Sequence, residues 1–213
     1  MTEREALPNL VPARPSDLVG MAEWDGMSLD GADLSAVNAA RVHMIECAVT
    51  RCHADTLETP GLTAAEVYVG AFSAGTWRLK DSEWRDATWA DIRVGALMAD
   101  NASMVDVAVR GSKIDLLSLR GAKVKRLTLT DCHVGTLDLS MATIDELTVH
   151  GGTVRELLTD DARMKRVDVS RTDLHAVGHP GSLRGLVVSP AQMIDMAEAL
   201  ASHLGIVVSE DGA

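Results

Sequence analysis

The chain has 213 residues, of which 46% are hydrophobic but only 3% are aromatic, and its formal net charge at pH 7 is -11. A chain of this length can bury a substantial core, and the scarcity of aromatic residues means that aliphatic side chains must fill most of it. The negative charge argues against direct binding of nucleic acid, because neutralising phosphates requires clustered Lys and Arg.

The first segment, residues 1–21, contains three Pro and shows little hydrophobic periodicity. We expect it to be a disordered or loosely draped N-terminal extension. It has no basic stretch followed by an apolar run, so no signal peptide is expected. No apolar run in the chain approaches the roughly 18 residues of a membrane helix, and three Cys do not make a disulfide framework. These features predict a cytoplasmic protein without a membrane partner.

Residues 22–174 follow a strict five-residue period. The period is seen by selecting, from Ala22 to Leu174, every residue whose number ends in 2, 4, 7 or 9. These 62 positions contain no Asp, Glu, Lys, Arg, Asn, Gln or His, and all 41 charged residues of the segment occupy the other positions. The pattern predicts that two side chains in every five face a dry interior and that three face water.

Neither regular secondary structure gives this period by itself. An α-helix, with about 3.6 residues per turn, would scatter the apolar positions around its axis. A flat strand would send residues five apart to opposite faces. A solenoid remains, in which each five-residue unit forms one side of a coil. The period therefore predicts an all-β solenoid over residues 22–174.

Several units resemble the A(D/N)LXX repeat of the pentapeptide-repeat proteins, namely GADLS (31–35), GAKVK (121–125), DCHVG (131–135) and MATID (141–145). This resemblance implies a right-handed quadrilateral β-helix with four units, or twenty residues, per coil. Residues 22–174 would then form about seven to eight coils, stacked at roughly 4.8 Å per coil. Characterised members of the family bind DNA gyrase by imitating duplex DNA, so the resemblance also implies DNA gyrase as a candidate partner.

The frame between residues 55 and 80 has two interpretations. An unbroken period turns Leu57, Leu62, Val67, Phe72 and Trp77 inward. A competing frame builds units on Ala65-x-Val67, Gly70-x-Phe72 and Gly75-x-Trp77, with loops around Pro60 and Arg78. We expect the unbroken frame, because it needs no insertion.

Residues twenty apart are expected to lie one above another. Outward charges would then form ladders of alternating sign along the rod: Asp106, Arg126, Glu146 and Arg166, with Lys125, Asp145 and Lys165 beside them. Such exposed pairs contribute little to stability, so their simplest role is to keep neighbouring coils from repelling each other.

The C-terminal segment, residues 175–213, is predicted to be a linker, a helix and a tail. The helix, residues 189–205, has Ser189 as its N-cap, Pro190 in its first turn, Gln192 three residues after the cap and Gly205 at its end. Its apolar face is expected to cover the open end of the solenoid, or else to form a homodimer contact; the residues concerned include Met193, Ile194, Ala197, Leu200 and Leu204. Ile206–Val208 could add a last edge strand.

The sequence gives no sign of catalytic or metal chemistry. In Cys52-His53 and Cys132-His133 the Cys is predicted to point inward and the His outward, so neither pair can share a metal. His175 and His179 are separated by Gly178, which favours a turn. No phosphate-binding loop, nucleophile elbow or HExxH motif is present. We therefore expect a non-enzyme without cofactor or metal.

The remaining variable is surface charge, which is concentrated toward the N-terminus. Residues 22–100 contain 13 acidic and 6 basic residues, whereas residues 101–174 contain 11 of each. The expected function is a binding or scaffold protein for a cytoplasmic partner, and the alternative is a DNA-mimicking regulator or protector of DNA gyrase. The acidic residues expected to bind the partner are Asp25, Asp30, Asp33, Glu46, Asp81, Glu83, Asp86 and Asp91.

Overall fold

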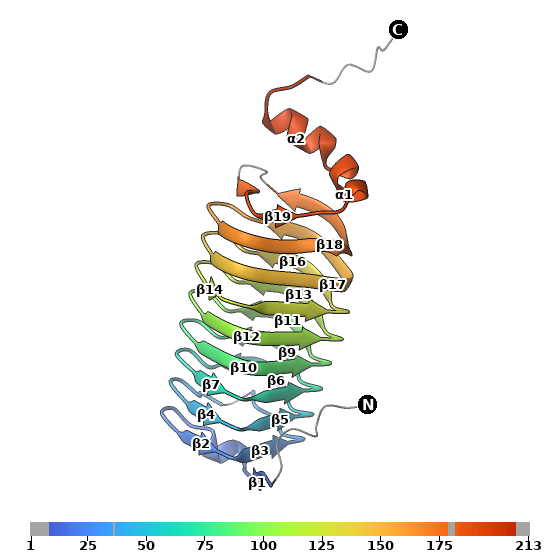
Figure 1. Cartoon of the computed structure of the whole chain (residues 1–213). Coiled ribbons are helices and arrows are strands. Elements are labelled where there is room, and N and C mark those ends of the chain that lie inside the picture. The colour runs from blue at the N-terminus through green and yellow to red at the C-terminus, as the bar shows by residue number, and fades with distance from the viewer. Residues whose placement is uncertain (1–8, 36, 179–181, 208–213) are drawn as a thin grey trace.

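The computed structural model describes residues 9–35, 37–178 and 182–207, which form a parallel β-solenoid of about nine turns followed by two short helices (Figure 1). Nearly every strand pairing joins residue n to residue n + 20. His53, for example, pairs with Ser73, and Lys113 pairs with His133. Twenty residues therefore make one turn, and the predicted all-β solenoid is confirmed.

Each turn consists of four sides of five residues. Side 1 contains residues 22–26 and every segment that follows at intervals of twenty; sides 2, 3 and 4 begin in the same way at residues 27, 32 and 37. Sides 1 and 2 carry one stack of strands, made of β2 (Glu23–Asp25), β3 (Met27–Asp30), β4 (His43–Ile45), β5 (Ala48–Thr50), β7 (Thr63–Ala65), β8 (Tyr68–Gly70), β10 (Glu83–Ala90), β12 (Ser103–Arg110), β14 (Lys123–Val124), β15 (Leu127–Thr130) and the first halves of β17 (Thr143–Leu158) and β18 (Arg163–Gly178).

The second stack covers side 3 and the start of side 4. It contains β6 (His53–Glu58), β9 (Ser73–Arg78), β11 (Arg93–Met98), β13 (Lys113–Ser118), β16 (His133–Asp138) and the second halves of β17 and β18. The described remainder of side 4 has no strand but still bonds to the next turn, as Leu79 N–H does to the Met98 carbonyl at 2.7 Å. Every side is thus fixed to its neighbours along the rod.

The corners explain why the period is five rather than two. Within a side, strand alternation turns the first and third residues inward and the second outward. A residue in the left-handed region then turns the chain and resets the alternation. Left-handed φ angles recur at residue numbers ending in 1 and 6, for example 56° at Glu66 and 49° at Ala71. The fourth corner, around residues 76 and 96, has no such residue among those described.

The core is a continuous ladder of aliphatic side chains along the axis. None of the 62 apolar positions is exposed, and all are buried except five that are half-buried: Ala22, Met27, Val37, Gly152 and Ala162. The unbroken frame over residues 55–80 is confirmed, because Leu57, Phe72 and Trp77 are buried and the pairing across this stretch keeps its offset of twenty.

The N-terminal segment differs from the expected loose extension in its described part, residues 9–21. β1 (Val11–Pro12) pairs with β3 at an offset of sixteen residues, and a 3-10 helix follows at Pro15–Asp17. Leu18 is buried, and the Asp17 carbonyl accepts a hydrogen bond from the indole N–H of Trp24 at 3.1 Å. Hydrogen bonding and burial thus hold this segment against the first turn.

The solenoid is also longer than the expected seven to eight coils. It has about nine turns, because paired strands lie on both sides of the periodic segment. β1 extends it at the N-terminal end, and β19 (Leu186–Val187) pairs with β18 at the C-terminal end. These two strands pair at offsets other than twenty, so a periodicity count does not detect them.

The expected C-terminal helix is present but interrupted. α1 (Pro190–Asp195) and α2 (Ala197–His203) meet at Met196. The predicted capping box is confirmed, since the Ser189 hydroxyl accepts the Gln192 N–H and the Gln192 side chain accepts the Ser189 N–H. Ile206 and Val207 do not form a strand, and Val208 lies outside the described residues. Both helices follow the last turn at the C-terminal end of the rod (Figure 1).

Candidate binding surface

The eight acidic residues expected to bind a partner do not share one surface. Four of them lie on side 1, which is the side formed by β2, β4, β7, β10, β12, β14, β17 and β18; these are Asp25, Glu46, Glu83 and Asp86. The others lie on side 2, on side 3 and at two further corners, and are Asp30, Asp33, Asp81 and Asp91 respectively. The structure therefore brings together half of the predicted set.

Side 1 also contains carboxylates that the prediction did not include. The corner position that ends side 1 carries an acid on four consecutive turns, at Glu46, Glu66, Asp86 and Asp106, which we call the acidic column. All four have left-handed φ angles, between 51° and 57°. Glu66 and Asp106 were missed, although each lies twenty residues after a predicted residue.

The charge of side 1 reverses one turn beyond the acidic column. Arg126 donates hydrogen bonds from Nε and Nη2 to the two carboxylate oxygens of Asp106. The side-chain hydrogen bond to Arg126 lowers the pKa of Asp106 and raises the pKa of Arg126. This pair is the boundary between two parts of the surface.

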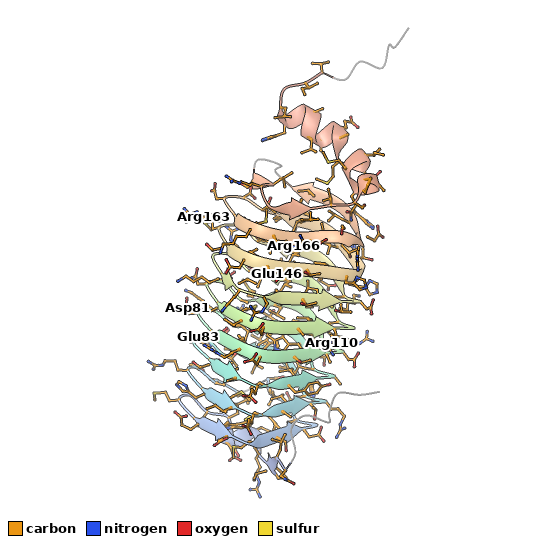
Figure 2. The ribbon with its side chains drawn as sticks, viewed as in Figure 1. Asp81, Glu83, Arg110, Glu146, Arg163 and Arg166 are labelled. Carbon is orange, nitrogen blue, oxygen red and sulfur yellow. The ribbon has the colours of Figure 1, made fainter. Side chains whose placement is uncertain are left out.

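We call the outward residues of side 1 from Glu23 to Asp106 the acidic half, and those from Lys123 to Arg166 the basic half. The acidic half has seven acids and one Arg: Glu23, Asp25, Glu46, Glu66, Glu83, Asp86, Asp106 and Arg85. The basic half has six bases and two acids: Lys123, Lys125, Arg126, Arg163, Lys165, Arg166, Asp145 and Glu146. Figure 2 shows Glu83 and Arg163 along the same edge of the rod, in opposite halves.

The predicted charge ladder forms in part. Besides the Asp106–Arg126 pair, Lys165 Nζ lies 2.7 Å from Asp145 Oδ1. Arg166 is stacked beside Glu146 in the strand pairing, but its guanidinium pairs at 2.6 Å with Asp168 on side 2. Successive turns are therefore linked by charge at some steps of the ladder and not at others.

The predicted acids on the other sides mostly contact neighbouring residues of their own surface. Asp30 accepts hydrogen bonds from the Thr50 hydroxyl, at 2.6 Å, and from Arg51. The Asp33 carboxylate accepts the Ser35 backbone N–H and hydroxyl, and the backbone hydrogen bond lowers the pKa of Asp33. Asp30 therefore links two successive turns, and Asp33 bonds within its own side. Neither residue extends the acidic column.

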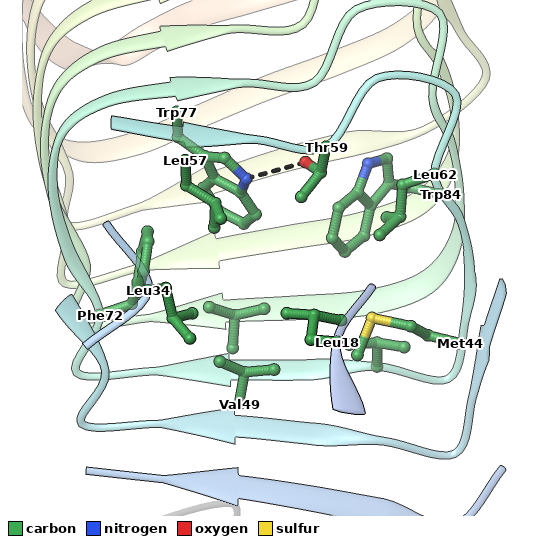
Figure 3. Close-up of a pocket in the computed structure, with 12 residues that line it drawn as sticks. Leu18, Leu34, Met44, Val49, Leu57, Thr59, Leu62, Phe72, Trp77 and Trp84 are labelled. Carbon is green, nitrogen blue, oxygen red and sulfur yellow. Dashed lines mark hydrogen bonds between the residues drawn. The ribbon is translucent and has the colours of Figure 1, made fainter. Parts of the chain in front are cut away.

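The interior formed by the described residues shows no chemistry that points to a ligand. Cys47, Cys52 and Cys132 are buried free thiols, and desolvation raises the pKa of each. A cavity of about 30 Å³ lies inside the N-terminal turns (Figure 3). Its lining is apolar except for Thr59, whose hydroxyl accepts the Trp77 indole N–H at 3.2 Å. Ligand pockets are typically at least ten times larger, and an apolar space of this size stays dry.

The described residues contain no group of three or more His, Cys, Asp or Glu that could hold a metal ion. His175 lies 3.0 Å from Asp173, and His179 lies outside the described residues. No helix in the described ranges is long and apolar enough to cross a membrane.

The apolar face of the C-terminal helices does not cover the end of the solenoid. Met193, Ile194 and Leu204 are 51%, 75% and 71% exposed; Ala197 is also exposed, and Leu200 is half-buried. The contact with the last turn includes hydrogen bonds, since Gln192 Nε2 donates to the carbonyls of Val169 and Thr172 at 2.8 Å each. Met196 packs against the core. The sequence interpretation placed Gln192 in the helix cap but missed its hydrogen bonds to the last turn.

Comparison of the sequence with known protein families finds no family model that matches it, and comparison with curated proteins finds no match either. The link to the pentapeptide-repeat proteins therefore remains a resemblance of sequence units. The most distinctive feature of the surface is the division of side 1 into an acidic and a basic half.

Proposed function

We propose that the protein is a non-enzymatic binding or scaffold protein, whose acidic half of side 1 docks a cytoplasmic protein partner with a basic surface. The observation that carries this proposal is the acidic column, which places one carboxylate on each of four consecutive turns. Strands of successive turns lie roughly 4.8 Å apart, so these like charges repel one another. Lys or Arg side chains of a partner would relieve that repulsion and gain attraction.

The acidic column suits such a role for two further reasons. Glu46 and Glu66 are exposed, and neither forms an ion pair with any other described residue. Their backbone is held in paired turns, as the Glu46 and Glu66 N–H groups bond to the carbonyls of Ala65 and Arg85 at 3.0 Å. A surface that is already ordered loses little conformational entropy when it binds.

The proposal can be tested by affinity capture from the native cytoplasm with two matched variants. The first, Glu46→Gln/Glu66→Gln/Asp86→Asn, neutralises the acidic column. The control, Asp55→Asn/Asp115→Asn/Asp131→Asn, removes the same number of exposed acids from other sides. We expect wild type and control to retain the same basic partner and the column variant to lose it, with weaker capture at high salt. Equal capture by both variants would contradict the proposal.

DNA mimicry of the gyrase-binding type is the second candidate, and the acidic column is also the feature that favours it. The column spans three steps of roughly 4.8 Å, or about 14 Å, which is the length of about four base pairs at 3.4 Å each. Beyond that, Arg126 and the basic half reverse the charge, which favours a protein partner over a duplex-like rod. A gyrase supercoiling assay with wild type and the column variant separates the two proposals.

We also propose the C-terminal helices as a homodimer contact, because the apolar side chains of Ile194 and Leu204 are exposed instead of covering the solenoid. Ile194→Asp/Leu204→Asp is expected to give a monomer at high salt, where wild type and the surface control Glu198→Gln remain dimeric. A wild-type protein that is monomeric at high salt would remove this contact from the proposal.

A further inference from the structure

We infer that side 1 is self-complementary, so that a second copy of this chain packs on it antiparallel through reciprocal contacts between the acidic and basic halves. Charge is segregated along side 1, with the acidic half at one end and the basic half at the other. A surface with seven acids at one end and six bases at the other attracts an inverted copy of itself. Complementary charge across an interface selects partner and register.

The register of the solenoid defines this arrangement in detail. A two-fold axis that lies between the copies and crosses the rod at a right angle inverts the order of the turns. It leaves each outward column facing its own counterpart in the second copy. With the axis between the turns of Arg85 and Val105, the turn 23–26 faces the turn 163–166, and the turn 63–66 faces the turn 123–126.

Residues of opposite charge then face each other at three positions. Glu23 faces Arg163 of the second copy, Asp25 faces Lys165, and Glu66 faces Arg126. Each match occurs twice by symmetry. Because Arg126 is already paired with Asp106, the additional positive charge that Glu66 meets comes from Lys123 and Lys125, which border this position and are exposed.

Two facing positions have like charges, and their surroundings compensate for them. Glu46 faces Glu146, but Arg126 and Arg166 occupy the turns on either side of Glu146. Asp86 faces Asp106, whose charge is already neutralised by Arg126. Val105, an apolar outward residue, lies beside the axis, where interfaces favour apolar side chains.

The size of the surface determines the strength of the pairing. Eight turns of side 1 give a length of about 38 Å, and four extended residues give a width of about 13 Å. The contact therefore buries about 1,000 Å² over both copies, at the lower limit for a specific complex. The dimer is consequently weak, concentration-dependent and sensitive to salt.

Self-pairing does not depend on the proposed function. If both hold, they compete, since a second copy covers Glu46 and Glu66 and leaves only the monomer able to bind a basic partner. The pairing is tested with the purified full-length chain alone, so its failure leaves the capture experiment unaffected. It also differs from an apolar contact through the C-terminal helices, which persists at high salt.

The test is sedimentation velocity in about 0.05 M and about 0.5 M NaCl, between which screening shortens the reach of surface charges about threefold. Every protein in this test carries Ile194→Asp/Leu204→Asp, so that the apolar contact of the helices does not contribute to association. We expect a reversible dimer at the lower salt and at least tenfold weaker association at the higher salt. Two charge-reversed proteins then locate the contact: Glu23→Lys/Asp25→Lys and Arg163→Glu/Lys165→Glu.

Each reversed protein alone is expected to be monomeric at low salt, because its facing turns now repel. An equimolar mixture of the two is expected to form a heterodimer, since both contacts between the different proteins become attractive again. The matched control Asp55→Lys/Asp115→Lys, on side 3, retains the low-salt dimer. The inference is overturned if the protein with unchanged side 1 is monomeric at low salt, if neither reversal weakens the dimer, or if mixing fails to restore association.

Discussion

Trp77 donates its indole N–H to the Thr59 hydroxyl at 3.2 Å inside the solenoid. Trp77 belongs to a cluster with Phe72, Trp84 and Trp89, whose ring centroids lie 5.0 to 5.9 Å apart. The indole N–H of Trp89 is buried without an acceptor among the described residues. Two neighbouring indoles of similar burial therefore differ in whether their polar atom is satisfied.

This difference predicts unequal effects of Trp77→Phe and Trp89→Phe. Both substitutions remove the same volume, so the packing loss is similar. Trp77→Phe also loses a hydrogen bond, whereas Trp89→Phe removes an unsatisfied donor. We expect Trp77→Phe to lower the free energy of unfolding by about 1–2 kcal/mol more than Trp89→Phe. Urea unfolding followed by circular dichroism measures both values, and equal losses would contradict the assignment.

The corners predict opposite effects for two Ala→Gly substitutions. Ala71 has a φ of 49° at a left-handed corner, whereas Ala96 lies in β11 at the corner without a left-handed residue. Ala71→Gly removes a steric cost and should stabilise the protein by about 0.5–1 kcal/mol, after the entropy of Gly is subtracted. Ala96→Gly has only the entropic cost and should destabilise it by about 0.5–1 kcal/mol. Thermal unfolding of both variants tests the sign.

Asp138 predicts a pH-dependent contribution to stability. Asp138 is only 7% exposed, and this burial by itself raises the pKa of the carboxyl group. Hydrogen bonds from Ser140 and Arg120 outweigh this effect, so the pKa lies below the ordinary value. A lowered folded-state pKa means stabilisation that is present above the unfolded-state pKa and is lost as the pH falls through the folded-state pKa.

We therefore expect Asp138→Asn to lower the free energy of unfolding by about 1–3 kcal/mol at neutral pH. The gap between wild type and variant should close as the pH falls below the normal range for Asp. Urea unfolding across pH 2–7 measures the gap. Asp131→Asn, at an exposed corner, is the control and should show little effect; a gap independent of pH would exclude the proposed charge effect.

Gln192 predicts how firmly the helices are attached. Its amide donates to two carbonyls of the last turn, and its oxygen accepts the Ser189 N–H at 2.7 Å. Gln192→Leu leaves these buried groups without hydrogen-bond partners, which costs about 1–3 kcal/mol of stability. We expect faster hydrogen exchange over α1 and β19 while the central turns stay protected. Asp195→Asn, on the exposed surface of α1, should leave exchange unchanged.

The solenoid could be predicted from the sequence because its cause is local and repeated. Two inward positions in every five exclude charge over the whole segment, and that exclusion is visible without coordinates. The ends could not be predicted in the same way. β1 and β19 pair at offsets of sixteen and nineteen residues, so no repeated pattern marks them.

The candidate surface was predicted only in part, for a different reason. Counting charges by chain segment averages over four sides, and residues 101–174 appear electrically balanced although the basic half lies among them. Grouping residues by intervals of twenty would have found Glu66 and Asp106, as well as the reversal at Arg126. The role of Gln192 had no such signal, because it depends on which carbonyls the final turn leaves without a following strand.

The offset of twenty residues has a consequence for how such a chain can change over time. Each turn bonds only to the turns immediately before and after it. Tandem duplication or loss of twenty residues in the gene would therefore lengthen or shorten the molecule without disturbing the remaining turns. A unit inserted between Asp106 and Arg126 would move the two oppositely charged regions apart by roughly 4.8 Å. Evolution could therefore change their separation in fixed steps, one turn at a time.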